Sequence, residues 1–497
     1  MTAPDATAGT AGAERARRVV LLIIGLLTAY RLVLAALLPF GIDESYALTI
    51  SRQFSLSYFD HPPLHLWLIG AWQALTGASD ALVLRLPFVL LGALSIYLLA
   101  RAAEALFSPE AAIWTALVAA VAPVFALVHG VMVLPDGPLL VAAAGLLLVL
   151  VPVIRGEEMS RRRWLLAGLM AGLAFLAKYH GALLVAGVFL SLLLTRPGRR
   201  ALAGPGPWLA ALVAFGVSLP VWVWNADHDF ASFAFQSGRS NWTGGPSLVL
   251  IGRSLLFQSA YLLPWVGVPL ALAALARLRR GAKGPALPLV VTGGLIILFF
   301  TLAAGFGGGL PHWQMPGWFL LIPVLGDALA HRRAGLRRLA RAAMLGSALL
   351  VALLGLGIGL QARFGSFDGL VAALGPRDPT VDLMDWDGLV PQLDAMGAGE
   401  PRTFIAATNW IRAGRVGAAV AGRWPVLCLC GDARHFAYLS PPANYAGWTG
   451  YVVMAPGEDD AVPAPFETVD APVAMPLERG GHVVLTLKVV KGTGFRP

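Results

Sequence analysis

Two adjacent carboxylates, Asp43 and Glu44, follow directly after the first long apolar stretch of the chain. Like charges this close raise each other's pKa, which gives one of the two carboxylates basic character and suits it to accept a proton. Acidic residues also cap or solvate the first turn of an ordinary helix. The spacing alone leaves both interpretations open.

Other side chains capable of acid–base or ionic chemistry lie at the ends of apolar stretches. A pair of prolines fixes an extended turn that presents Asp60 and His61. Asp136 has a plainer interpretation as the cap of a helix that begins at the next residue, and His312 as an ordinary interfacial histidine. The candidates for chemistry are Asp43, Glu44, Asp60, His61, Asp136, Lys178, Arg239 and His312.

The elements that must position these residues are apolar helices. The 497 residues are 57% hydrophobic and only 13% charged, with mean hydropathy +0.70. This composition excludes a cytosolic enzyme, a disordered chain, a repeat solenoid and a disulfide-stapled secreted domain. Apolar stretches long enough for membrane helices predict about eleven spans in a polytopic α-helical membrane protein. We expect these spans near residues 19–40, 81–100, 111–127, 137–154, 164–177, 181–195, 207–225, 248–276, 285–304, 316–330 and 342–360.

The net charge of +9 indicates orientation rather than nucleic-acid binding. The segments between the predicted spans form two alternating sets. One set holds 20 lysines and arginines and the other holds three, which are Arg52, Lys178 and Arg239. By the positive-inside rule the first set is cytoplasmic. The N-terminus is then cytoplasmic, and residues 361–497 lie outside.

The first apolar stretch also resembles a signal peptide, because arginines precede it. Its length favours an uncleaved first helix. Arg31 lies within this stretch, and we expect it to be a structural charge inside the helix bundle, since a lipid-facing arginine there is costly.

Residues 361–497 form a second domain beyond the membrane domain of residues 1–360. Short β-like runs at 402–407, 426–430, 451–455 and 482–490, joined by Pro- and Gly-rich connections, predict a small extracytoplasmic α/β domain. Cys428 and Cys430 are close enough in sequence that a disulfide between them would be strained. We expect them to be two small buried hydrophobic residues of one strand.

The stretch from Pro62 to Gly77 is rich in aromatic and aliphatic side chains, and no charged residue occurs after Leu64. About 14 residues of helix reach only ~21 Å, which is too short to cross the hydrocarbon layer. We therefore expect a helix that lies in the membrane interface and walls a cleft open sideways to lipid. The alternative is a packed re-entrant segment.

Several separated segments together resemble the bacterial GT-C glycosyltransferases of the protein O-mannosyltransferase and aminoarabinose-transferase group. The similarity covers essentially the whole membrane region, and residues 406–438 also resemble the external domain of bacterial members. The matching segments are the first span ending in Asp43-Glu44, DHPPL at 60–64, MVLPDGPLL around Asp136, LAFLAKYHG around Lys178, FQSGR ending at Arg239, and LPHWQMPGW around His312.

The resemblance implies a GT-C-like fold and an inverting transfer of a sugar from a polyprenyl-phosphate donor. It makes Asp43 the candidate base for an acceptor hydroxyl. Lys178, Arg239 and His312 become candidates to stabilise the departing phosphate. Asp136 is a candidate to bind sugar hydroxyls, orient a cation or hold a metal.

The resemblance also implies a multi-pass protein of the bacterial inner membrane, with lipid A, another glycolipid or a protein hydroxyl as acceptor. No spacing prescribes a metal site, although scattered acids suit Mg²⁺ or Mn²⁺. A monomer is expected, with no nucleic-acid partner. Two other classes stay open: a non-enzymatic lipid or glycan translocator, and a scaffold that anchors the C-terminal domain.

Overall fold

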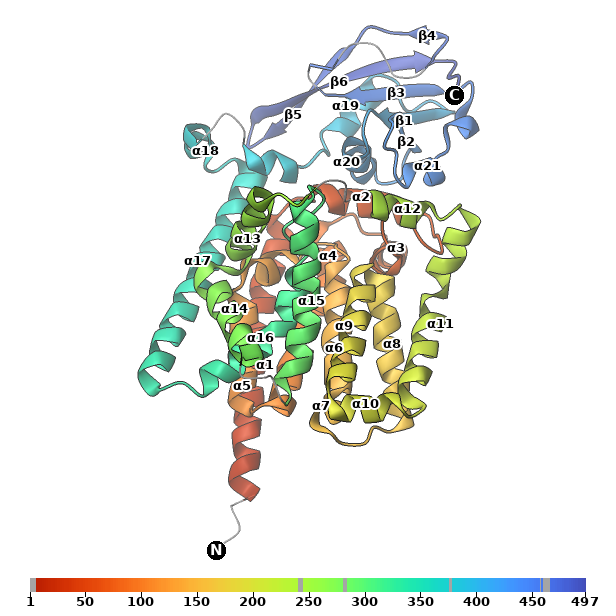
Figure 1. Ribbon diagram of the computed structural model, residues 1–497. Helices are drawn as coiled ribbons and strands as arrows, with labels where there is room; N and C mark the ends of the chain where they lie inside the picture. The colour runs from red at the N-terminus through yellow and green to blue at the C-terminus, as the bar shows by residue number, and fades with distance from the viewer. Residues whose placement is uncertain (1–5, 240–244, 280–283, 375–377, 456, 459–464) are drawn as a thin grey trace, which may run out of the picture.

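The computed structural model describes residues 6–239, 245–279, 284–374, 378–455, 457–458 and 465–497. A bundle of helices is capped at one end by the C-terminal domain, and the N-terminus emerges at the opposite end (Figure 1). The helices of the bundle are α1 (Ala6–Leu37), α2 (Ile42–Ile50), α3 (Leu64–Thr76), α4 (Ala81–Leu106), α5 (Pro109–Val121), the π-helical turn η1 (Val124–Val128), α6 (Asp136–Val149), α7 (Val151–Arg155), α8 (Arg161–Ala177), α9 (His180–Leu194), α10 (Arg196–Leu202), α11 (Gly206–Asp227), α12 (Ala231–Gly238), α13 (Leu248–Leu262), α14 (Pro264–Arg279), α15 (Ala286–Gly305), α16 (Met315–Ala330) and α17 (Ala334–Phe364).

Within the described residues, five helices are long and apolar enough to cross a membrane: α1, α4, α11, α15 and α17. The bent pairs α9–α10 and α13–α14 raise this number to seven if each pair is one span, and α5, α6 and α16 are shorter apolar helices. Each predicted span coincides with a helix or helix pair. That eleven of them cross a membrane stays a prediction.

One predicted span has a different shape from the one expected. Residues 248–276 form two helices, α13 and α14, that meet at 109°. Pro264 begins the second helix, and a proline disfavours helical backbone at the residue before it. Leu263 accordingly adopts a positive φ of 68° and breaks the helix.

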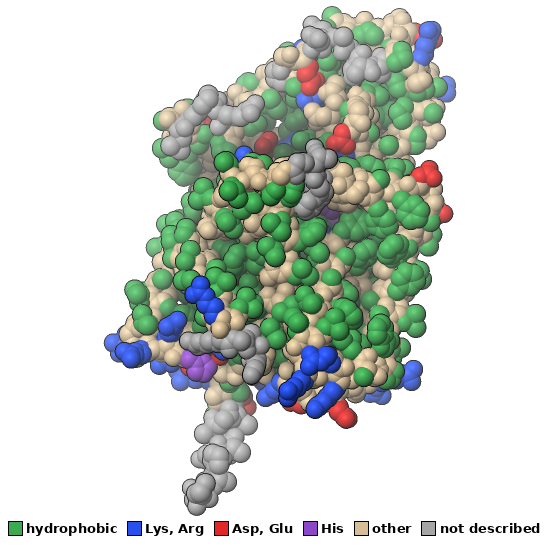
Figure 2. Space-filling model, viewed as in Figure 1, with side chains coloured by type: hydrophobic (Ala, Val, Ile, Leu, Met, Phe, Trp, Pro, Cys, Tyr) green, Lys and Arg blue, Asp and Glu red, His purple; other side chains and the backbone are tan. Residues whose placement is uncertain are grey.

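The surface of the bundle is divided by side-chain type. Hydrophobic side chains cover its middle, and lysines and arginines gather at the end away from the C-terminal domain (Figure 2). That end includes α7, which ends at Arg155, and α10, which contains Arg196, Arg199 and Arg200 (Figure 1). The basic set of connections therefore lies at one end of the bundle, opposite the C-terminal domain.

Arg31 is buried inside the bundle, as predicted for a structural charge. Its guanidinium donates to the carbonyl oxygens of Phe125 at 2.5 Å and Ala126 at 3.1 Å, in the π-helical turn η1. A side chain at Gly130 would overlap the guanidinium, since a Cβ built there lies 2.2 Å from its Cζ. The arginine thus supplies donors to carbonyls at an irregular turn.

The C-terminal domain is the predicted α/β domain, built on one mixed sheet. Strands β2, β1 and β3 are parallel, and β6 joins β3 antiparallel and carries β4 and β5. Strands β4 and β5 were not predicted. The elements are α18 (Asp368–Leu374), η2 (Pro379–Leu383), α19 (Leu389–Ala395), β1 (Thr403–Ala407), α20 (Trp410–Val420), β2 (Val426–Cys428), α21 (Phe436–Leu439), η3 (Pro442–Tyr445), β3 (Thr449–Met454), β4 (Thr468–Val469), β5 (Val473–Arg479) and β6 (His482–Thr493).

The domain docks on the bundle through close contact between α20 and α2. Gly414 and Gly417 face α2 one turn apart, and a Cβ at Gly417 would lie 2.2 Å from the side chain of Thr49. The Thr49 hydroxyl donates to the Gly414 carbonyl at 3.0 Å. Because these two glycines carry no side chain, the backbones of α20 and α2 approach closely, and α2 is held between the bundle and the domain.

The prediction for the cysteines was wrong. Cys428 and Cys430 form a disulfide. Strand β2 ends at Cys428, and Cys430 lies in the bend that follows it, so the two side chains do not share one extended strand.

Candidate active site

A cavity of about 590 Å³ lies where the bundle meets the C-terminal domain. Its walls come from α2, α3, α9, α12 and α15 and from the loops beside them, with Arg434 and the turn η2 from the C-terminal domain. All eight candidates from the sequence line this one cavity: Asp43, Glu44, Asp60, His61, Asp136, Lys178, Arg239 and His312.

The two adjacent carboxylates of α2 have different surroundings. Asp43 projects into the cavity and makes no hydrogen bond or ion pair with a described residue. Surrounding protein atoms exclude much of the water around it, and this burial raises the pKa of Asp43; Arg434 opposes the rise, and Asp60 and Glu44 add to it. Asp43 is thus a free carboxylate with increased proton affinity, as expected for one member of the pair.

Glu44 is fully occupied by structural contacts. Its Oε1 and Oε2 accept from Arg85 of α4 at 2.8 and 2.6 Å and from the backbone amides of Val133 at 3.0 Å and Gly41 at 2.9 Å. Burial alone would raise the pKa of Glu44, but Arg85 and the amides hold that pKa below its usual value. Glu44 closes a capping box and ties α2 to α4 and to the loop before α6, so its geometry is that of a positioning residue.

Asp136 and Lys178 form a buried ion pair. Asp136 begins α6, Lys178 follows the last residue of α8, and the Lys178 Nζ lies 3.0 Å from both carboxylate oxygens. His129 Nε2 lies 3.7 Å from Oδ1 of the same carboxylate. The carboxylate therefore contacts a cation, and its interpretation as a simple helix cap was wrong.

Asp60 connects the proline turn to both domains. Its Oδ1 accepts from the Tyr46 hydroxyl of α2 at 2.8 Å, and its backbone carbonyl accepts from Gln236 of α12 at 2.6 Å. Its Oδ2 lies 3.5 Å from Arg434, and the Tyr46 oxygen in turn accepts from the amide of His435 at 3.1 Å. The turn, α2, α12 and the C-terminal domain are therefore joined around one aspartate, through its carboxylate and its backbone carbonyl.

The histidines of the cavity are neutral at physiological pH. Burial lowers the pKa of His61 to about 3, with Lys178 and Arg239 adding to the effect, and burial and Lys178 lower that of His312 to about 3. His312 therefore faces the cavity as a neutral imidazole, which offers one N–H donor and one acceptor rather than a positive charge. Arg239, by contrast, is a cation that lies over the Trp313 ring, with Cζ 4.7 Å from its centroid.

The sequence reasoning missed three groups of this site. Arg85 lies inside a predicted span, so nothing in the sequence indicated that it pairs with Glu44. Tyr46 is an ordinary helical residue, so its hydrogen bond to Asp60 was not predicted either. Arg434 belongs to the segment 406–438, whose resemblance to related external domains was its only signal. The predicted helix in residues 62–77 is α3, and its His65 and Leu66 line the cavity. That α3 lies in the membrane interface beside an opening to lipid stays a prediction.

Nothing in the described parts of the chain gathers three or more metal-binding side chains. Asp136 was the candidate metal ligand, and Lys178 already contacts both of its carboxylate oxygens. This donor set suits an ion pair better than a divalent cation.

Comparison with known proteins agrees with the sequence motifs. Residues 60–224 match the family model of dolichyl-phosphate-mannose-protein mannosyltransferases. The lipid A galacturonosyltransferase RgtD of Rhizobium johnstonii is 29% identical over 204 residues, an alignment that covers 41% of this chain and 42% of that protein. Together with the fold, these matches support one group. The chain is similar in sequence and fold to GT-C glycosyltransferases of the protein O-mannosyltransferase and ArnT-like group.

The similarity of fold extends over almost the whole chain. The structure of ArnT from Cupriavidus metallidurans bound to undecaprenyl phosphate superposes with a TM-score of 0.66 at 17% identity, over 95% of this chain and 97% of that one. Its apo structure gives the same values. The shared architecture includes the C-terminal domain, because 95% of the chain is covered.

Proposed function

We propose that the protein moves a sugar from a polyprenyl-phosphate-linked donor to an envelope acceptor at the external face of the bacterial inner membrane. One observation carries the proposal: a single cavity, at the end of the bundle away from the basic connections, combines an unpaired carboxylate with several cations. Undecaprenyl phosphate in the similarly folded ArnT supports the donor class.

Asp43 acts as the base in this proposal. Its carboxylate faces the cavity without a partner among the described residues, and its raised pKa strengthens it as a proton acceptor. Removal of the proton from an acceptor hydroxyl lets the oxygen attack the anomeric carbon from the side opposite the phosphate. The configuration at that carbon is inverted, the new glycosidic bond forms, and the polyprenyl phosphate leaves with the bonding electron pair.

Fixed cations stabilise the leaving phosphate as its negative charge grows. Lys178 and Arg239 supply positive charge, and neutral His61 and His312 supply hydrogen bonds. The Lys178–Asp136 pair is held in place before substrate arrives, so its reorientation during the reaction is small. In this proposal, Asp60 and Asp136 contact sugar hydroxyls.

The distribution of lysines and arginines also determines the proposed orientation of the protein in the membrane. The basic end of the bundle is proposed to face the cytoplasm, with the N-terminus, and the C-terminal domain to face the periplasm. The acceptor class includes lipid A, supported by the function named for the related RgtD, as well as another glycolipid or a protein hydroxyl.

The proposal is tested by mass spectrometry of envelope lipids and proteins from cells with and without the protein. Loss of a sugar mass in its absence, restored by the wild-type chain but not by Asp43→Asn, is the expected result. The translocator alternative predicts that Asp43→Asn restores the modification fully, and that outcome would replace the proposal.

A further inference from the structure

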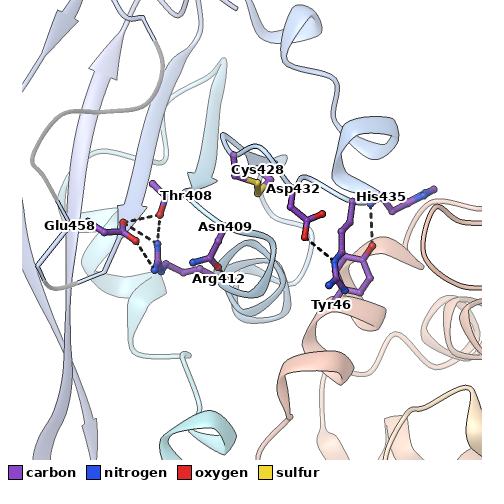
Figure 3. The surroundings of a disulfide bond; sticks show 10 residues. Tyr46, Thr408, Asn409, Arg412, Cys428, Asp432, His435 and Glu458 are labelled. Atoms are coloured by element: carbon purple, nitrogen blue, oxygen red, sulfur yellow. Dashed lines mark hydrogen bonds and ion pairs between the residues drawn. A yellow bond between two sulfur atoms is a disulfide. The ribbon is translucent and has the colours of Figure 1, made fainter. Parts of the chain in front are cut away.

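Arg434 enters the cavity from the C-terminal domain through an unusual backbone. It lies in the short loop between β2 and α21, and its φ of 48° is in the left-handed region, which side chains other than glycine adopt at a cost. Figure 3 shows its neighbours Asp432 and His435, with His435 beside Tyr46 of the bundle. The loop is thus held in a strained form that places a guanidinium at the domain boundary.

Arg434 and Arg239 converge on one aromatic ring. The guanidinium Cζ atoms lie 5.6 Å and 5.7 Å from the centroid of Phe235, which is on α12. Arg434 also lies 3.5 Å over Trp410, and Arg239 lies over Trp313. Two like charges from two domains are therefore held near each other by aromatic faces, and an oxyanion bound to both would reduce their repulsion.

The two arginines keep hydrogen-bond donors free. Arg434 forms only long ion pairs, at 3.5 Å, with the carboxylates of Asp60 and Asp432, and its buried Nε makes no hydrogen bond. Arg239 forms no ion pair with any residue that the structure describes. Lys178 is the contrast, with two carboxylate oxygens at 3.0 Å. A guanidinium offers five N–H donors, so this pair has donors to spare.

We propose that Arg239 and Arg434 form an oxyanion subsite shared by the two domains, which binds a phosphate or a carboxylate of the substrate. The subsite rests on the proposed function, since it lies in the same cavity as Asp43. It assigns the C-terminal domain a direct part in substrate binding. Guanidinium pairs bind both oxyanions through charge-assisted hydrogen bonds.

The two sources of the oxyanion are the lipid-carrier phosphate and a carboxylate on the sugar. Two probes distinguish these sources: undecaprenyl phosphate without sugar, and free galacturonate. Each probe is titrated against the full-length protein in detergent. Binding is followed by the rise in melting temperature. The variants are Arg434→Gln and Arg434→Gly, the latter suited to the positive φ.

Arg423→Gln is the matched control. Arg423 belongs to the same domain, lies 4.3 Å over the Trp424 ring and pairs with Asp394 at 2.7 Å, but it does not line the cavity. We expect both Arg434 variants to weaken one probe about tenfold or more, as for loss of a charge-assisted hydrogen bond, and the control to leave both probes unchanged.

The readouts separate a binding role from a structural one. A binding role predicts that Arg434→Gly melts no lower than wild type without ligand yet loses the stabilisation by the probe. Weaker undecaprenyl phosphate binding identifies the carrier phosphate, and weaker galacturonate binding identifies a sugar carboxylate. Unchanged binding of both probes in both variants would overturn the subsite. If the Arg434 variants bind a probe more weakly but the wild-type protein transfers no sugar, the proposed function is overturned and the subsite stands.

Discussion

Asp43 and Glu44 are neighbours in sequence, but their substitutions should have opposite consequences. Asp43→Asn keeps the shape of a side chain that has no described hydrogen-bond partner, so the free energy of unfolding should change by only about 0.5 kcal/mol. Turnover should fall by about a hundredfold or more, the usual effect of removing a general base. A hundredfold loss corresponds to about 2.7 kcal/mol of transition-state stabilisation.

Glu44→Gln should reverse this pattern. Glu44 and Arg85 are both buried, and the pair is surrounded by two amides and by three carbonyl oxygens that accept from Arg85 at 2.5 to 3.1 Å. Loss of one partner in a buried pair leaves an uncompensated charge, at about 3–5 kcal/mol. Because the pKa of Glu44 is lower in the folded than in the unfolded state, this stabilisation is present at neutral pH and is lost only as the pH falls through the folded value.

The assay combines thermal melts in detergent with turnover of a purified donor, measured by mass spectrometry of the product. Turnover of the wild type should also fall on acidification at a higher pH than for an ordinary aspartate, because protonation of Asp43 removes the base and its pKa is raised. Near-wild-type turnover of Asp43→Asn would refute the base assignment. A Glu44→Gln protein as stable as wild type would refute the positioning role.

Neutral substitution of Lys178 or Arg239 should weaken donor binding and turnover, and the two losses should be less than additive if both serve one phosphate; full additivity in the double variant would place them in different sites. A probe that does not cross the inner membrane should label a cysteine introduced at Ser247 but not one at Arg279, and the reverse labelling would invert the topology. Polar replacement of the two tryptophans of α3 should raise the apparent KM for a long-chain donor much more than for a short, water-soluble one, whereas equal changes would leave α3 a purely packed element. Turnover should survive EDTA, since Lys178 occupies the candidate metal ligand; a loss reversed by Mg²⁺ or Mn²⁺ would contradict this.

The sequence was sufficient for the helices of the bundle, because a long apolar stretch has few other folds available to it. The prediction from sequence failed where a single residue interrupts a long apolar or β-like stretch. Pro264 turns one apolar stretch into two helices at 109°, although hydropathy averaged over the stretch is unaffected by the break. In the C-terminal domain, the bend after Cys428 ends a run that β-propensity alone extends to Cys430.

The candidate site was predictable where each segment offered a charged residue at the end of an apolar stretch. This rule found residues on α2 and α6, and directly after α8 and α12, that meet in one cavity. It could not separate Asp43 from Glu44, because the distinction depends on Arg85, a residue inside an apolar stretch and 41 positions away from Glu44. Partnership across the fold, rather than residue type, decides which carboxylate is free.

Arg434 connects the candidate site to the contact between the two domains. The contact between α20 and α2 fixes the helix that bears Asp43, and the loop after β2 brings Arg434 to the same cavity. Arg434 exerts the largest charge effect on the pKa of Asp43 and lowers it, while burial raises it. The C-terminal domain therefore contributes both to the position of Asp43, the proposed base, and to its proton affinity, so a chain truncated after α17 should lose turnover even if its bundle folds.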